Sequence, residues 1–190
     1  MDYPKLSDAV ENSVLYDSVR HFFSVKEMHP LPTTDTDPAG LSVLTIPATE
    51  NLLQSYMFSE STNNSVCIIL TGPGSIKSGS DVNISLTWDS HLSGTSKAVT
   101  WRIDGFKITP GGSNTFTYGS AVSASYSISQ DQTAISNFQT STLNSLFGEG
   151  GATTVLRISR LPDTPGDTMD SNAALLYGVS VRYLTNSDEF

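Results

Sequence analysis

Hydrophobic and polar residues alternate with a period of two along most of the chain after residue 40. The clearest case runs from Val82 to Trp88, where every second residue is apolar and Asn, Ser and Thr lie between. This alternation predicts a strand with one buried face. Other predicted strands are 41–46, 52–58, 65–71, 99–103, 115–127, 134–140, 153–160 and 173–183. Turns at about 8–12-residue intervals separate them, which indicates an all-β, jelly-roll-like antiparallel sandwich of about eight strands.

Two of these strands each carry a tryptophan. Residues 82–88 and 99–103 flank the turn residues Ser93-Gly94-Thr95, so we expect them to pair as a hairpin with Trp88 on one arm and Trp101 on the other. Each tryptophan is in phase with the aliphatic residues of its strand, which favours burial in the core over a platform for a sugar ring. Residues 136–147 suit either a strand or a short helical turn around Leu143, Leu146 and Phe147.

The first 40 residues follow a different pattern. Apolar residues between 7 and 24 recur at helix-like spacing, and Asp8 with Glu11 resembles a capping box. Three prolines among threonines and aspartates at 28–38 predict an extended linker. We therefore expect an N-terminal arm with a short amphipathic helix at 1–40 and a sandwich domain at 41–190. The arm either packs on its own sandwich or binds a partner, through Tyr3, Val10, Val14, Leu15, Phe22 and Phe23.

Net charge bears on the expected partners, and the single cysteine bears on the expected compartment. The chain has 190 residues and a formal net charge of −9, from 19 acidic and 10 basic residues without a basic run. This balance disfavours nucleic acid and anionic membrane as partners. The only cysteine, Cys67, lies in an apolar run and is expected to be a buried, inert thiol. Without a signal peptide or a membrane span in the sequence, we expect synthesis in a reducing cytoplasm.

Catalytic motifs are missing from the sequence. It contains no phosphate-binding glycine loop and no Gly-x-Ser-x-Gly elbow, and its three histidines lack ligand-like spacing. We therefore expect no enzyme activity, no cofactor and no small-molecule substrate. The loop at 160–170 offers one alternative, a hard-cation site formed by Asp163, Asp167 and Asp170. Ordinary turn chemistry, with aspartates accepting bonds from backbone amides, is the favoured interpretation.

Several motifs occur in an order that resembles one known family. They are Ile46-Pro47-Ala48, then Gly79-Ser80-Asp81-Val82 leading to Trp88, then Val99-Thr100-Trp101, and a strand–loop–strand ending from Leu156 to Tyr183. This order is similar to that of small virion structural proteins of tailed bacteriophages. The resemblance covers about 140 residues from Ile46 onward, and the arm is not part of it.

The resemblance implies a jelly-roll homotrimer located in the virion after assembly in the host cytoplasm. Its implied function is that of a capsid decoration or cement protein, which stabilises the phage head by binding the major capsid protein, or another virion protein, through the arm. One alternative is a head-fibre, tail-fibre or neck appendage protein for host contact. An alternative of another class is a carbohydrate-binding module that uses Trp88 and Trp101.

Overall fold

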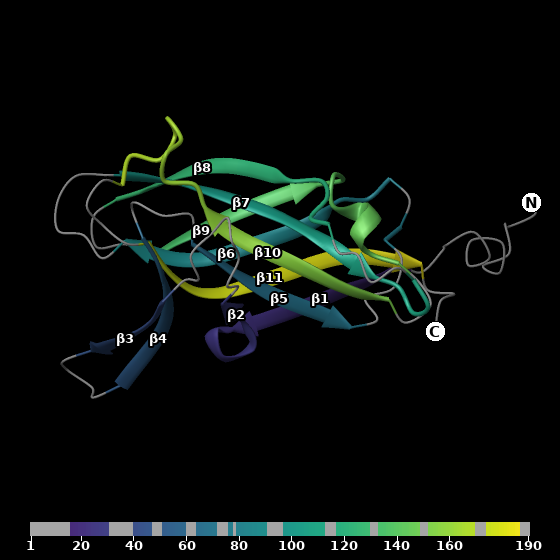
Figure 1. Ribbon diagram of the computed structural model, residues 1–190, viewed down its shortest axis with the longest axis horizontal. Coiled ribbons are helices and arrows are strands. Elements are labelled where there is room, and N and C mark those ends of the chain that lie inside the picture. The colour runs from purple at the N-terminus through teal and green to yellow at the C-terminus, as the bar shows by residue number, and fades with distance from the viewer. Residues whose placement is uncertain are drawn as a thin grey trace, which may run out of the picture.

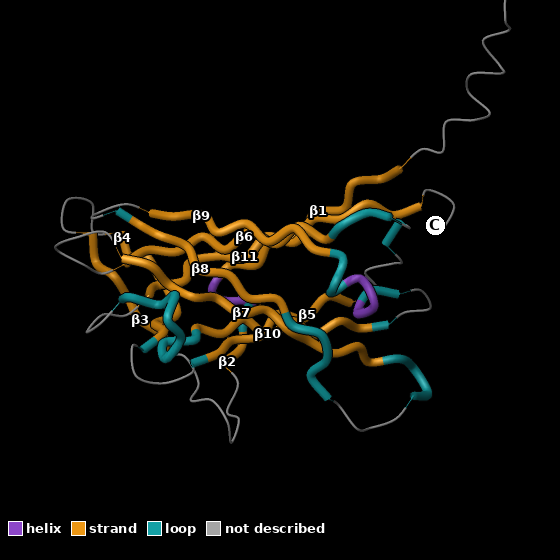
Figure 2. Tube along the Cα trace, turned by 90° about the horizontal axis from the view of Figure 1, so that it is seen from above, coloured by secondary structure: helices purple, strands orange, loops and turns teal. Residues whose placement is uncertain are grey.

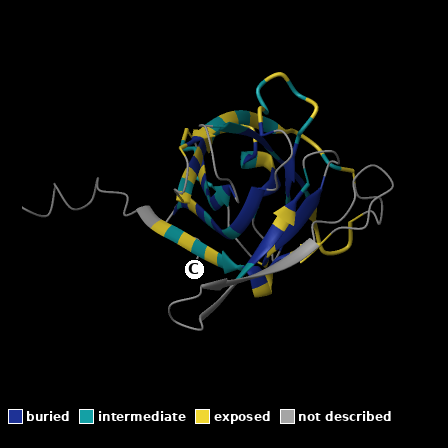
Figure 3. Cartoon of the chain, turned by 90° about the vertical axis from the view of Figure 1, so that its left-hand side faces the viewer, coloured by how far each residue is buried: buried dark blue, intermediate teal, exposed yellow. Residues whose placement is uncertain are grey.

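The chain folds into two antiparallel sheets packed face to face (Figures 1 and 2). The computed structural model describes residues 16–30, 40–46, 51–59, 64–71, 76–77, 79–90, 97–112, 117–129, 133–148, 152–169 and 174–186. Apolar side chains from both sheets fill the space between them, and the end view in Figure 3 shows the buried residues gathered there. The predicted all-β, jelly-roll-like sandwich is confirmed.

The larger sheet has the order β3-β4-β11-β6-β9, and β1 also pairs with β11. The smaller sheet has the order β2-β5-β10-β7-β8. The strands of the larger sheet are β1 (Tyr16–Ser24), β3 (Gly40–Ile46), β4 (Asn51–Phe58), β6 (Val82–Ser90), β9 (Thr133–Thr140) and β11 (Ala174–Asn186). Those of the smaller sheet are β2 (His29–Pro30), β5 (Ser65–Thr71), β7 (Lys97–Ile108), β8 (Val122–Ile128) and β10 (Thr153–Arg160). Two single-turn 3-10 helices, η1 (Val25–Glu27) and η2 (Asn144–Leu146), lie between strands.

Residues 16–24 form strand β1, so the prediction of a helix there is wrong. β1 pairs with β11 from Tyr16 opposite Asn186 to Ser24 opposite Gly178. Within β1, Val19, His21 and Phe23 are partly buried, whereas Arg20 and Phe22 between them are exposed, which is a period of two and not of 3.6. The edge of β11 also needs a hydrogen-bonding partner, and β1 supplies it. Tyr3, Val10, Val14 and Leu15 lie outside the described residues.

The expected arm therefore has its residues 16–30 built into the sandwich. After β1, η1 buries Val25, and Met28 is 2% exposed in the core. The hydroxyl of Tyr56 on β4 donates to the Met28 carbonyl oxygen at 3.1 Å. β2 then pairs with β5, so this short stretch crosses from the larger sheet to the smaller one.

The two tryptophan strands are present, but they do not form the predicted hairpin. β6 pairs with β9 and β11, whereas β7 pairs with β8 and β10 in the other sheet. Trp88 and Trp101 therefore meet across the sandwich, with ring centroids 5.8 Å apart and an edge-to-face angle of 69°. Both side chains are 0% exposed, which agrees with the favoured interpretation that they are core residues.

One end of the core is closed by aromatic residues around Tyr183. Its ring lies 5.0 Å from that of Phe147 and 6.0 Å from that of His21, measured between centroids. The Tyr183 hydroxyl is 3.3 Å from Nε2 of His21, a hydrogen bond between β11 and β1. Burial raises the pKa of Tyr183 from 10.0 to about 12, and burial lowers the pKa of His21.

We expect Tyr183 to make the fold sensitive to alkali. Its folded pKa lies above its unfolded value, so its contribution is complete below about pH 10 and is lost as the pH rises towards about 12. Over that window the free energy of unfolding should fall by about 1.4 kcal/mol per pH unit for this group. Urea unfolding of the wild type and of Tyr183→Phe, repeated from about pH 10 to about pH 12, measures this fall in the free energy of unfolding. Equal pH slopes for the two proteins would contradict the prediction.

Candidate functional site

The outer surface of the larger sheet is polar along four adjacent strands, in the order β1-β11-β6-β9. Its inward positions are apolar, for example Ile84 and Leu86 on β6 and Val181 on β11. The outward positions between them carry arginine, asparagine, glutamine, serine and threonine. Because adjacent strands lie about 4.8 Å apart, these four strands span about 14 Å. We call this surface the polar face.

The strand registers place the outward residues of the polar face in three straight rows. The first row is Arg20, Arg182, Asn83 and Gln139, the second is Phe22, Ser180, Ser85 and Asn137, and the third is Ser24, Gly178, Thr87 and Ile135. Rows two residues apart on a strand are about 6.6 Å apart. The result is a grid of hydrogen-bonding side chains bounded by an exposed apolar residue on each edge strand, Phe22 on β1 and Ile135 on β9.

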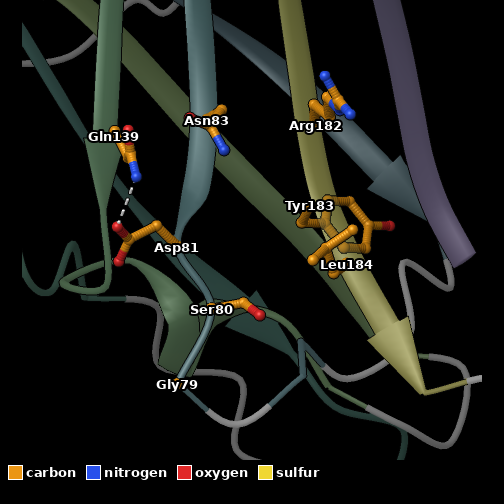
Figure 4. A pocket seen from close by; sticks show the side chains of 8 residues that line it. All are labelled: Gly79, Ser80, Asp81, Asn83, Gln139, Arg182, Tyr183 and Leu184. Atoms are coloured by element: carbon orange, nitrogen blue, oxygen red, sulfur yellow. Dashed lines mark hydrogen bonds between the residues drawn. The ribbon is translucent and has the colours of Figure 1, made fainter. Parts of the chain in front are cut away.

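Two adjoining hollows follow the first two rows. One, of about 470 Å³, is lined by Arg20, Arg182, Asn83, Gln139, Ser85, Asn137 and Ser180. The other, of about 410 Å³, shares Asn83, Gln139 and Arg182 with it and continues to the turn at Gly79 and Ser80 (Figure 4). Together they form a groove whose floor is the sheet itself and whose lining is mainly polar, with Leu184 and the carboxylate of Asp81 in the second hollow.

Short hydrogen bonds hold several of these side chains over the sheet. Nε of Arg20 donates to Oγ of Ser180 at 3.2 Å, and Nε of Arg182 donates to Oγ of Ser18 at 3.0 Å. Oγ of Ser85 donates to Oδ1 of Asn137 at 2.7 Å. These bonds fix the directions of the guanidinium and amide groups, so that the remaining donors and acceptors are presented to a ligand with little loss of side-chain entropy.

Phe22 provides an aromatic surface at the edge of the groove. Its side chain is 60% exposed, although a phenylalanine in this position would ordinarily be buried. A Cβ added to Gly178 would lie 3.0 Å and 3.1 Å from two atoms of the Phe22 ring, so the ring lies against the sheet where glycine leaves room for it. Tyr177 precedes this glycine at a β-bulge, and burial, with Asp89 beside it, raises its pKa to about 12.

The residues predicted for the arm take two different positions. Phe23 packs against the core from the inner side of β1, and Phe22 lies on the polar face. Two of the residues whose spacing suggested a helix thus point to opposite sides of a strand.

The predicted cation ligands do not lie together in the described part of the chain. Asp167 is in a buried ion pair with Arg160, Asp163 is exposed, and Asp170 lies outside the described residues. Within the residues that the structure describes, no three His, Cys, Asp or Glu side chains are grouped to hold a metal ion. In the same residues no helix has the length and hydrophobicity to cross a membrane. Cys67 is buried, and burial raises the pKa of its thiol.

The polar face was not predicted from the sequence. The polar residues of β6 were visible as the outward half of an alternating strand, but their neighbours come from β1, β11 and β9, which are far apart in the sequence. Asn83 and Gln139 were therefore not recognised as neighbours. The available signal was the side-chain type at outward positions, Asn, Gln and Arg, where Lys and Glu are the common choice for a solvated face.

No family model and no curated protein sequence matches this chain. The CBM22-1 xylan-binding domain from Paenibacillus barcinonensis Xyn10C is similar at 13% identity and a TM-score of 0.47, over 89% of this chain and 95% of that chain. A CBM28 module specific for non-crystalline cellulose is similar at 10% identity and a TM-score of 0.40, over 85% and 87%. The family 11 module from Clostridium thermocellum, in complex with a mixed-linked tetrasaccharide, has 10% identity and a TM-score of 0.36, over 90% of each chain.

The predicted function of a capsid decoration protein is contradicted by these comparisons, because the three similar structures are carbohydrate-binding modules. The physical basis of the predicted capsid clamp fails as well, since residues 16–24 are a strand of the sandwich and not a helix on a tether. The resemblance to phage virion proteins, the virion location and the homotrimer stay predictions of the sequence. Likenesses this distant carry no argument about the ligand, which therefore rests on the residues of this chain.

Proposed function

We propose that this chain binds carbohydrate on its polar face, without reacting with it. The observation that carries the proposal is the groove itself, a four-strand floor of amides, hydroxyls and guanidinium groups beside one exposed aromatic ring. A sugar presents hydroxyls, which both donate and accept, and an apolar face of C–H groups. Asparagine and glutamine match the hydroxyls because each amide has donors and acceptors, and an aromatic ring matches the C–H face.

The position of the aromatic ring distinguishes this proposal from the one made on the sequence. Trp88 and Trp101, expected as the alternative sugar platform, are 0% exposed and cannot reach a ligand. Phe22 is exposed and lies in the same row as Ser180, Ser85 and Asn137. A glycan chain with one sugar ring on Phe22 therefore has hydrogen-bonding partners for its other units along the row, on strands β11, β6 and β9.

A hollow on an open sheet suits a polymer better than a small free sugar. The two hollows adjoin, so the groove runs from the second row to the turn at Gly79. A chain of several sugar units can contact it at successive positions, and each contact adds to the affinity once the chain is held. We therefore expect binding to polysaccharides or long oligosaccharides in preference to monosaccharides.

We expect Phe22→Ala to weaken carbohydrate binding roughly twofold to tenfold, which corresponds to the ~0.5–1.5 kcal/mol typical of an aromatic contact. Stability should change little because the side chain is mostly exposed. Binding to a panel of soluble polysaccharides, measured by retardation in gels that contain them, gives the affinity, and urea unfolding gives the stability. Ile69→Ala is the matched control, since it removes a 44% exposed apolar side chain from the other sheet.

Gly178→Ala provides a second test that leaves the phenylalanine in place. The added Cβ makes the Phe22 ring shift by a few tenths of an ångström, so binding should weaken, by less than in Phe22→Ala, although no contact residue is lost. If Phe22→Ala and Gly178→Ala were both retarded as strongly as the wild type, Phe22 would not be a contact for the sugar. No retardation of the wild type by any polysaccharide of the panel would overturn the proposed function.

A further inference from the structure

The polar face carries two arginines directly opposite each other on neighbouring strands. Arg20 on β1 and Arg182 on β11 are register partners. Like charges in directly opposite positions destabilise a sheet, so a pair of this kind requires a compensating role. The chain as a whole is acidic, with 10 basic residues and a net charge of −9, which makes two adjacent guanidinium groups on one face the more unusual.

These two arginines also differ from the other arginines that the structure describes. Arg102 and Arg157 both form ion pairs with Asp104, and Arg160 forms one with Asp167. Arg20 and Arg182 each donate through Nε to a neutral serine hydroxyl, and neither forms an ion pair with a carboxylate of the described residues. Both side chains are exposed and line the same hollow. Their positive charge thus faces the groove. One described carboxylate also lines it, Asp81 in the second hollow, which accepts from Nε2 of Gln139 at 3.1 Å and has no ion pair with either arginine among the described residues.

We infer that the carbohydrate bound on the polar face is an anionic one, with carboxylate or sulfate groups on its sugars. A guanidinium group matches a carboxylate or sulfate because two parallel N–H donors meet two oxygens. Nε of each arginine is held by serine, which leaves the Nη groups as donors for a ligand. Asn83, Gln139 and Asn137 on the neighbouring strands then contact hydroxyls of further sugar units of the same glycan chain. The inference rests on the proposed function and specifies the class of ligand.

Two matched pairs of polymers test this inference. Polygalacturonate is compared with its fully methyl-esterified form, which has the same backbone without charge, and dextran sulfate is compared with dextran. We expect the charged member of at least one pair to bind the wild type more tightly than its neutral counterpart. The pair that shows the difference identifies the anion as carboxylate or sulfate. The affinity should fall as salt is raised from about 0.05 M to about 0.5 M, because the screening length shortens.

The double variant Arg20→Gln/Arg182→Gln separates charge from hydrogen bonding. Glutamine can still donate to a sugar hydroxyl, so binding of any neutral glycan should be kept, whereas binding of the anionic polymer should weaken roughly tenfold to hundredfold. Lys26→Gln/Lys107→Gln is the control, because it removes the same two charges from exposed positions outside the polar face. This control should bind like the wild type.

The outcomes that overturn the inference differ from those that overturn the proposed function. Equal affinity for the charged and neutral member of both pairs shows that a glycan binds but its charge is not recognised. Equal weakening by the arginine and lysine variants shows that only the overall charge matters, and it overturns the inference too. No binding to any of the four polymers, or to any neutral polysaccharide of the earlier panel, overturns both.

Discussion

Trp88→Ala is expected to destabilise the protein by about 3–5 kcal/mol, the usual cost of removing a large aromatic side chain from a packed core. Trp88 is 0% exposed and packs edge-to-face on Trp101, which in turn packs on Phe58 at 5.1 Å between centroids. These rings join the two sheets at the centre of the sandwich, so a cavity there removes contacts from both. Most domains have a total stability of 5–15 kcal/mol, and the variant should therefore be close to unfolding.

The conservative variant of the same residue isolates its hydrogen bond. Nε1 of Trp88 donates to the buried hydroxyl of Ser136 at 2.7 Å, whereas Nε1 of Trp101 is buried without a partner among the described residues. Trp88→Phe should thus cost about 1–2 kcal/mol more than Trp101→Phe, because it leaves Ser136 without its donor. Urea unfolding of the two variants, both of which should fold, gives this difference directly. Equal costs would mean that the Ser136 bond contributes nothing to stability.

These variants also distinguish a core role from a ligand role. Trp88→Phe should bind polysaccharide as the wild type does at temperatures where it is folded, because the indole lies on the inner side of β6 and the polar face is on the outer side. A Trp88→Phe protein that is folded but no longer binds polysaccharide would show that Trp88 contributes to the binding site. Phe22→Ala should show the opposite behaviour, with stability kept and binding weakened.

The period-two pattern predicted the strands well because each strand of an antiparallel sandwich has one buried face. Val82 to Trp88 shows this directly, with every second side chain buried in the structure. What alternation cannot show is which strand edges pair. β6 and β7 each look like half of a hairpin around Ser93-Gly94-Thr95, yet the connection crosses from one sheet to the other. Strand pairing depends on contacts between residues that are far apart in the sequence, and the local alternation of residues does not reveal these contacts.

β1 was missed for a different reason. Phe22 and Phe23 are adjacent, so the pair fits the spacing of an apolar helical stripe and gives no clean alternation. In the strand Phe23 packs against the core and Phe22 lies on the polar face. The helix prediction placed both phenylalanines on one contact surface. The site was missed with it, because Phe22, Arg20 and Arg182 become neighbours only through the pairing of β1 with β11.

The loop at 160–170 was recognised from the sequence, but the ion pair between Arg160 and Asp167 was not predicted. The aspartates at 163, 167 and 170 suggested either a cation site or turn chemistry. Asp167 does accept from the backbone amide of Met169 at 3.2 Å, as turn chemistry predicts, and it also pairs with the arginine seven residues before it. Both side chains are 1% exposed. A sequence gives no sign that a long charged side chain such as Arg160 turns inward, because arginine is ordinarily exposed and its burial is decided by the partners that the fold brings to it.

Breaking this ion pair on one side is expected to cost about 3–5 kcal/mol, because it leaves a buried charge without its partner. Nε and Nη2 of Arg160 donate to the two oxygens of Asp167 at 2.9 Å and 2.8 Å. The same guanidinium donates to the carbonyl oxygens of Phe58 and Met169. Asp167 also accepts from the backbone amide of Thr100 at 3.1 Å. The pair therefore ties the 161–169 loop to β4, β7 and β10.

The losses in the free energy of unfolding should be strongly non-additive between the single and double variants, because the two residues act as a pair. Arg160→Met and Asp167→Leu should each be severely destabilising, while the double variant should be more stable than the sum of the two predicts, because no unpaired charge remains. Arg102→Met is the matched control. Arg102 is 40% exposed and its partner Asp104 keeps a second arginine, Arg157, so about 1 kcal/mol or less should be lost. Additive costs in urea unfolding would show that the two charges are not coupled and that the loop is held by its packing alone.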